Sequence, residues 1–111
     1  MPIKPLAWLG DTRGRVREFS DEARGHVGFE LWEVQCGKEP SDWKPMPSVG
    51  LGVNEIRVRA DGAYRILYVA KFAEAVYLLH AFQKKTQKTA PADIELARLR
   101  FRALMRERKK P

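Results

Sequence analysis

The hydrophobic pattern is most regular in the middle of the chain, over residues 53–72. Two runs of alternating apolar and polar residues flank Asp61-Gly62, a dipeptide typical of the tight turn between antiparallel strands. In the first run, one face holds Ile56 and Val58 and the other holds Glu55, Arg57 and Arg59. In the second run, one face holds Tyr64, Ile66 and Tyr68 and the other holds Arg65, Leu67 and Val69. The pattern therefore predicts a β-hairpin.

An apolar run over residues 76–82 follows the hairpin and stops at Gln83. A strand that is apolar on both faces is typical of a position inside a sheet that is covered on both sides. Lys84, Lys85 and Lys88 come directly after this run. We therefore expect the strand to deliver a lysine cluster to one edge of the sheet.

The segments before and after these strands have apolar residues at the spacing of helices. Ser20 is a favourable N-cap, and Asp21 and Glu22 put negative charge in the first turn after it. The apolar stripe of this helix is Ala23, Val27, Leu31 and Val34, and Gly37 is placed to end it. A shorter helix, capped by Asp11 or Thr12 and with Val16 and Phe19 turned inward, completes a helical hairpin.

The last helix is predicted to begin at Pro91 or Ala92. Its inward stripe is Ile94, Ala97, Phe101 and Leu104, and its other faces carry Arg98, Arg100, Arg102 and Arg106. This helix is therefore amphipathic and strongly basic.

The remaining segments complete the expected order of elements. Residues 3–8 predict a short first strand, and residues 38–52, rich in proline and glycine, predict a loop or a poorly regular edge strand. The order is then β-α-α-β-β-β-α. We predict one α+β domain over residues 1–111, a small, mostly antiparallel sheet with an N-terminal helical hairpin and a C-terminal helix packed against it.

The charge is unevenly distributed along the chain. There are 21 Lys and Arg residues against 14 Asp and Glu residues, a net charge of +7. Residues 1–82 contain 11 of each sign, whereas residues 83–111 contain 10 basic and 3 acidic residues. The whole excess lies in the last quarter of the chain. It favours a polyanionic partner such as nucleic acid, the ribosome or an acidic protein; the alternative is a solubilising tail.

Several classes of protein are not supported by the sequence. His26, His80 and Cys36 lack the spacing of metal ligands, and no glycine-rich phosphate-binding loop is present. A single cysteine excludes an intrachain disulfide, and no run approaches the roughly 20 apolar residues that cross a bilayer. We expect a cytoplasmic protein that uses no metal and no cofactor and has no membrane association.

The residues that converge in the predicted fold are basic. Arg57 and Arg65 lie on neighbouring strands of the hairpin, and Lys84 and Lys85 leave the end of the next strand. Fixed cations in this arrangement suit a phosphodiester, because they stabilise the extra charge of a pentavalent transition state. The pattern therefore favours metal-free RNA cleavage among the reactions of phosphate esters.

Such cleavage also needs a base for the 2′-hydroxyl proton and an acid for the leaving 5′-oxygen. A lysine whose pKa is lowered by other cations is one candidate, and Tyr68 and His80 are the others. Arginine is unsuitable as a base because it stays protonated. Packing in the core is the alternative interpretation of both Tyr68 and His80.

An ordered set of segments carries a family resemblance. They are Glu55-Ile56-Arg57, Tyr64-Arg65-Ile66-Leu67-Tyr68, Leu79-His80-Ala81-Phe82 with Lys84-Lys85-Thr86, the helix after Pro91 with Ala97 and Arg98, and, upstream, Leu31, Gln35 and Gly37. This set resembles the RelE/ParE superfamily of bacterial type II toxins, and most closely its HigB-like, phage-derived branch. The resemblance covers nearly the whole chain.

The resemblance implies a RelE-like fold and a ribosome-dependent ribonuclease that cuts mRNA without a metal. Arg57 and Arg65 would hold the scissile phosphate, Lys84 and Lys85 match a basic pair after the last strand, and Tyr68 and His80 match positions whose role varies among members. The C-terminal catalytic tyrosine of some RelE proteins has no counterpart, because Tyr77 is the last tyrosine. Contacts to RNA backbone would come from Lys88, Arg98, Arg102 and Arg106.

The resemblance also implies partners, namely mRNA, the ribosome and a cognate helix-turn-helix antitoxin, with oligomers formed mainly through the antitoxin. Two other functions remain open from the sequence. One is a ParE-like toxin that targets gyrase, and the other is a basic RNA- or ribosome-binding protein without catalysis.

Overall fold

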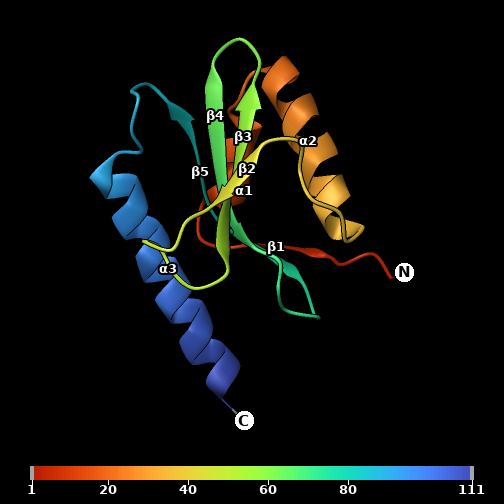
Figure 1. Cartoon of the computed structure of the whole chain (residues 1–111), viewed down its shortest axis with the longest axis vertical. Coiled ribbons are helices and arrows are strands. Elements are labelled where there is room, and N and C mark those ends of the chain that lie inside the picture. The colour runs from red at the N-terminus through yellow and green to blue at the C-terminus, as the bar shows by residue number, and fades with distance from the viewer. Residues whose placement is uncertain (1, 111) are drawn as a thin grey trace.

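The computed structural model describes residues 2–110 and contains five strands and three helices (Figure 1). In chain order they are β1 (Leu6–Trp8), α1 (Thr12–Arg17), α2 (Asp21–Gln35), β2 (Trp43–Pro45), β3 (Val53–Arg59), β4 (Ala63–Val69), β5 (Val76–Lys84) and α3 (Pro91–Lys109). The strands form one sheet in the order β1-β5-β4-β3-β2. The pairing of β1 with β5 is parallel, and the other three pairings are antiparallel.

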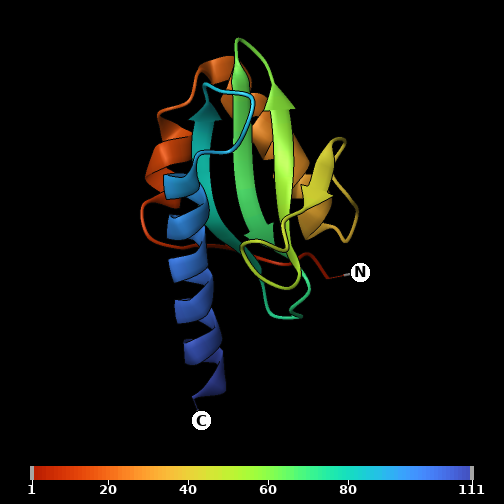
Figure 2. The same cartoon turned by 60° about the vertical axis from the view of Figure 1, so that its left-hand side comes forward.

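The sheet is covered on both faces. The helices α1 and α2 pack on one face and α3 packs on the other, and the C-terminal half of α3 extends past the end of the sheet (Figures 1 and 2). This arrangement confirms the predicted α+β fold with an N-terminal helical hairpin and a C-terminal helix. The segment predicted as a loop or an edge strand contains β2, a short strand that pairs with β3 at the sheet edge.

The central hairpin has the predicted turn at Asp61-Gly62. Its register pairs Arg57 with Arg65 directly across the two strands. The turn is tied to α2 by Ser20, whose hydroxyl donates a hydrogen bond of 2.8 Å to Asp61 Oδ1 and accepts one of 3.1 Å from the backbone N–H of Ala23. One serine therefore caps α2 and anchors the hairpin tip.

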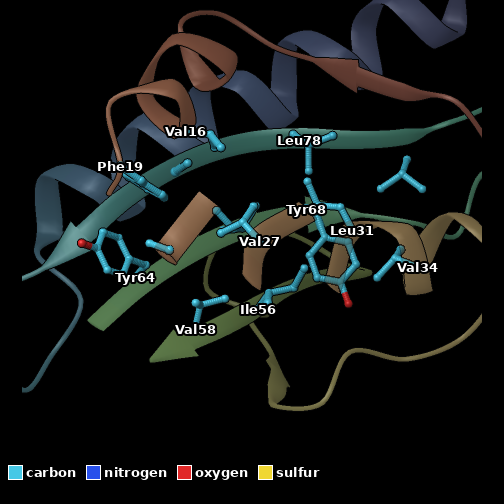
Figure 3. Close-up of a cluster of buried hydrophobic side chains, with 14 residues drawn as sticks. Val16, Phe19, Val27, Leu31, Val34, Ile56, Val58, Tyr64, Tyr68 and Leu78 are labelled. Atoms are coloured by element: carbon cyan, nitrogen blue, oxygen red, sulfur yellow. The ribbon is translucent and has the colours of Figure 1, made fainter. Parts of the chain in front are cut away.

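Between the sheet and the helical hairpin lies the larger hydrophobic core (Figure 3). It consists of Val16, Phe19, Ala23, Val27, Leu31, Val34, Ile56, Val58, Tyr64, Ile66, Tyr68, Val76, Leu78 and Ala81. The apolar stripe predicted for α2 and the apolar faces predicted for the hairpin strands all belong to it. Burying these side chains is the main favourable contribution to folding.

The opposite face has its own core under α3. It consists of Met46, Val49, Val53, Leu67, Val69, Leu79, Phe82, Ala97 and Leu104. The pairing of β4 with β5 shifts here, because Leu67 pairs with His80 whereas Tyr68 pairs with Leu78. Leu79 is thus an extra residue in β5, a β-bulge of the kind that re-aims neighbouring side chains. Leu79 packs in this core, and His80 reaches α3.

One arginine of α3 differs from its predicted outward position. Arg100 is mostly buried, and its Nη1 donates to Leu79 O at 2.9 Å and to Thr12 Oγ1 at 3.2 Å. Its Nη2 lies 2.6 Å from Asp11 Oδ1. The side chain of Asp11 therefore pairs with α3 and with Arg15 rather than capping α1.

Replacing Ser20 with alanine is expected to lower the free energy of unfolding by about 1–2 kcal/mol, because both the N-cap and the link to Asp61 are lost. Ser20→Thr keeps the hydroxyl and should retain most of the stability. Ser48→Ala is the matched control, since that exposed residue uses its backbone carbonyl, not its hydroxyl, to hold Arg98. Urea denaturation followed by circular dichroism measures all three, and equal midpoints for Ser20→Ala and Ser48→Ala would contradict the expectation.

Candidate functional site

A basic cleft opens where β4 begins and β5 ends. We define the basic cleft by its lining residues, which are Arg59, Ala63, Arg65, Lys84, Lys85, Thr86 and Gln87, around a volume of about 420 Å³. Residues 85–90 cross in front of β4 before α3 begins (Figure 2). The predicted lysine cluster therefore does lie at the edge of a hollow that cationic side chains surround.

Arg57 and Arg65 stand side by side on the face of the sheet that α3 covers farther along. Residues paired directly across antiparallel strands project to the same face, with Cβ atoms about 5 Å apart. The Arg65 side chain is 11% exposed and that of Arg57 is 33% exposed. The predicted pairing of these arginines is thus present, and both guanidinium groups are held at the base of a partly open site.

Beneath the two arginines lies a buried carboxylate. Glu55 is 0% exposed, and its Oε1 lies 3.5 Å from the Nε of Arg57 and 3.5 Å from the Nε of Arg65. Its Oε2 accepts a hydrogen bond of 3.3 Å from the hydroxyl of Thr89, just before α3. A buried carboxylate without partners would be strongly unfavourable, so these three contacts explain how the chain tolerates it.

Two cations of the site, Arg65 and Lys84, have a lowered pKa. Burial is the largest cause that lowers the pKa of Arg65, and the neighbouring Arg57 adds to it. The pKa of Lys84 is also lowered, first by loss of solvent and then by the positive charge of Arg65. Lys84 therefore gives up its proton more readily than an ordinary lysine, which suits a general base.

His80 lies under α3 rather than among the lining residues of the basic cleft. Its Nε2 is 2.7 Å from Asp93 Oδ1, and its ring stacks on Phe82 at a centroid distance of 5.1 Å. Burial lowers the pKa of His80, although the bond to Asp93 acts in the opposite direction. Nδ1 is buried and has no hydrogen-bond partner among the described residues. These contacts are those of a residue that fixes the start of α3 to the sheet.

Tyr68 lies on the other face of the sheet, in the core beneath α2 (Figure 3). Burial raises its pKa to about 12. The structure does not bring Tyr68 to the basic cleft, because residues at alternate positions of β4 face opposite sides and Arg65 faces the side of α3. Among the candidates for the base, Tyr68 and His80 are absent from the lining of the basic cleft, whereas Lys84 and Lys85 belong to it.

The basic residues outside the cleft are spread along the loop and α3. Lys88 is exposed on residues 85–90. Arg98 donates to Ser48 O at 2.6 Å and pairs with Glu95, which also lies 3.6 Å from Arg102 Nη2. Arg106 is exposed one turn farther along α3. These residues form a surface of positive charge, separate from the two arginines of the sheet.

Three residues of the site were not expected from the sequence. Arg59 lines the basic cleft, and Glu55 and Thr89 lie beneath it, but none of the three was singled out as a site residue. Alternation does place Glu55 and Arg59 on the same face as Arg57. The burial of Glu55 had no local signal, since Thr89 reaches it from 34 positions away.

No group of three or more potential metal ligands is present within residues 2–110. Within the same residues, no helix is both long and apolar enough to cross a membrane. What the site offers is a set of fixed cations around a hollow, and such a set binds and stabilises phosphate oxygens.

The stability of the fold is expected to decrease as the pH falls below about 6.5, the ordinary pKa of histidine, because His80 then becomes protonated. The pKa of His80 is lower in the folded than in the unfolded chain, so the unfolded chain takes up the proton first. Stability is therefore full above the unfolded pKa and lost as pH falls through the folded pKa. Denaturation midpoints from pH 7 to pH 5 measure the loss, and His80→Gln should flatten it. The same slope in wild type and variant would contradict this assignment.

Comparison with known proteins identifies the family to which the chain belongs. No curated protein matches the chain. Residues 15–102 match the model of the family described as Phage derived protein Gp49-like (DUF891), and this range includes α2, the whole central hairpin, β5 and most of α3. Arg57, Arg65 and Lys84 all lie within the matched range. The chain thus belongs to the Gp49-like family of phage-derived proteins, which is a family of RelE/HigB-like toxins.

Proposed function

We propose that the chain is the toxin of a type II toxin–antitoxin system and that it cleaves mRNA on the ribosome without a metal ion. One observation carries the proposal. Arg65 lines one open basic cleft together with Lys84, a lysine of lowered pKa, and Arg57 pairs with Arg65 across β3 and β4 beside that cleft. A phosphodiester needs these two functions, cations for its oxygens and a base for its 2′-hydroxyl.

In the proposed reaction, Arg57 and Arg65 bind the non-bridging oxygens of the scissile phosphate. Neutral Lys84 takes the 2′-hydroxyl proton, and the 2′-oxygen forms a bond to phosphorus. The bond from phosphorus to the 5′-oxygen breaks, and the leaving oxygen takes a proton from the ammonium group of Lys85, which lines the same cleft. The products are a 2′,3′-cyclic phosphate and a 5′-hydroxyl.

Membership of a toxin–antitoxin family implies an antitoxin as partner. We propose that this partner is a helix-turn-helix protein and that it brings toxin copies together. The basic face of α3, with Arg98, Arg102 and Arg106, is proposed to contact ribosomal RNA. Positive side chains attract the phosphates of any RNA sequence equally. This property fits a role in docking to the ribosome and not in cutting the mRNA.

Arg57→Ala and Arg65→Ala are each expected to slow cleavage by about 10²–10³-fold, the usual effect of removing one donor or cation that stabilises a transition state. The measurement is induced expression without the neighbouring gene, followed by primer extension on an abundant mRNA. Wild type should create new 5′ ends inside translated regions, and the two variants should not. Arg13→Ala, an exposed arginine of α1, is the matched control and should cut as wild type does.

The other outcomes of that experiment are equally informative. Growth arrest with intact mRNA would contradict cleavage and indicate a protein target such as gyrase. Neither arrest nor cuts would indicate a basic RNA- or ribosome-binding protein without catalysis.

Binding to ribosomes is expected to weaken as salt concentration rises. Each lost phosphate contact should lower the slope of log affinity against log salt by about 1. The double variant Arg102→Ala/Arg106→Ala should therefore reduce the slope by about 2 if both residues contact phosphates. Sedimentation of ribosomes at several salt concentrations measures the slope, and Arg13→Ala/Arg17→Ala on α1 controls for net charge. Equal slopes for both pairs would contradict a docking role for α3.

A further inference from the structure

We propose that Glu55 is a positioning residue for the reaction, one that aims Arg57 and Arg65 at the scissile phosphate and limits the positive charge of the site. The inference rests on the proposed function of the basic cleft. It assigns a role to a carboxylate that has no access to RNA and that an RNA-binding surface would otherwise be expected to lack.

The geometry of the three side chains carries the first part. A guanidinium group has one edge that includes Nε and a far end with its two Nη atoms. Glu55 Oε1 lies 3.5 Å from both Nε atoms; it accepts a hydrogen bond from Arg57 Nε, whereas the buried Arg65 Nε is held by charge and makes no hydrogen bond among the described residues. Arg65 Nη1 also donates to Tyr64 O at 3.1 Å, which further fixes the plane of that group. The carboxylate therefore pairs with the Nε edges of both arginines, while Arg57 Nη1 lies 4.0 Å from Asp42 Oδ1.

The burial of Glu55 excludes a role as the general base. Glu55 is 0% exposed, so no 2′-hydroxyl can reach its oxygens while the site keeps this structure. Its second oxygen is bound to Thr89, which also ties residues 85–90 of the cleft rim to β3. Glu55 can thus act on the substrate only through the residues that it holds.

Charge carries the second part. When Lys84 is neutral and ready to take a proton, Arg57, Arg65 and Glu55 together contribute a charge of +1, to which Lys85 and Arg59 of the cleft add. When the proton has moved to Lys84, the site gains one positive charge, and the phosphorane that forms carries one more negative charge than the phosphodiester. Each change on the substrate is therefore balanced by the same change in the site. A site without Glu55 would have an extra positive charge in both states, which attracts the uncleaved RNA and the transition state alike and so tightens binding without raising the maximal rate.

The charged groups that face Lys84 come from three strands. Arg57 and Glu55 come from β3, Arg65 from β4 and Lys44 from β2, where Lys44 pairs with Glu55 across the strands. The arginines and Lys44 lower the pKa of Lys84, whereas Glu55 raises it. Removing the charge of Glu55 should hence move the pH at which Lys84 loses its proton farther down.

The experiment compares wild type with Glu55→Gln in single-turnover cleavage of mRNA on programmed ribosomes, over a range of toxin concentrations and pH values. We expect Glu55→Gln to reach half-maximal rate at the same or a lower concentration. Its maximal rate should fall by about tenfold or more, the order of loss that misplaced catalytic groups produce. The ascending limb of its pH profile should shift to lower pH. Glu30→Gln is the matched control, because Glu30 is a buried carboxylate of α2 that binds Ser41 on the other side of the sheet.

Several outcomes would overturn the inference while the proposed function stands. One is a Glu55→Gln protein that cuts as fast as wild type with an unshifted pH profile. Another is a Glu55→Gln protein whose affinity and cleavage rate both fall in proportion to its fraction of unfolded protein, as expected for a residue that only packs. Glu55→Asp keeps the charge, so a pH profile like that of wild type is expected for it even where its rate is lower. A profile shifted as far as that of Glu55→Gln would count against the charge argument.

Failure of the proposed function has a different signature. If wild type makes no cuts, the role in cleavage falls with it, and the positioning of the arginines is decided by NMR. The Nε–H signal of Arg57, assigned with Arg57→Lys, should exchange slowly with water in wild type and in Glu30→Gln and rapidly in Glu55→Gln. Equal exchange in all three proteins would overturn the positioning as well.

Discussion

The sheet is packed on both faces, and this constraint decides where charged side chains can stand. Helices α1 and α2 close one face along its length, so the residues that β3 and β4 direct to that side are apolar or tyrosine, apart from Asn54 beside Tyr68. The other face is covered by α3 and the loop before β3. Among the described residues, only 85–90 cover the end of this face near the hairpin turn (Figure 2). The arginines of the hairpin lie at this end, the one region of that face where guanidinium groups keep contact with water.

The same constraint explains how far the sequence predicts the site. Arg57 and Arg65 are each four residues from Asp61, so a tight turn at that point pairs them, and alternation puts both on one face. The turn dipeptide and a period of two were thus sufficient for the central pair. They were also sufficient for the core position of Tyr68, the alternative that the structure bears out.

Other features depend on contacts that no local pattern encodes. The bulge at Leu79 sits in a run that is apolar throughout, where the side-chain period gives no register, and it decides that His80 faces α3. Glu55 alternates like a solvent-facing residue and becomes buried only when Thr89 folds over it. In the sequence, nothing distinguishes Arg100 from the other basic residues of α3. Its burial depends on the pairing with Asp11, which follows β1. In each case the deciding partner is distant in the sequence.

The parallel pairing of β1 with β5 bears on the order in which the molecule assembles. Leu6 pairs with Val76, so this contact closes a loop of about seventy residues, whereas the Asp61-Gly62 hairpin closes one of a few residues. Because the entropy of closure rises with loop length, the hairpin can form early, and β1 can join only after β5 is in place. The strand that joins last is also short and only partly buried.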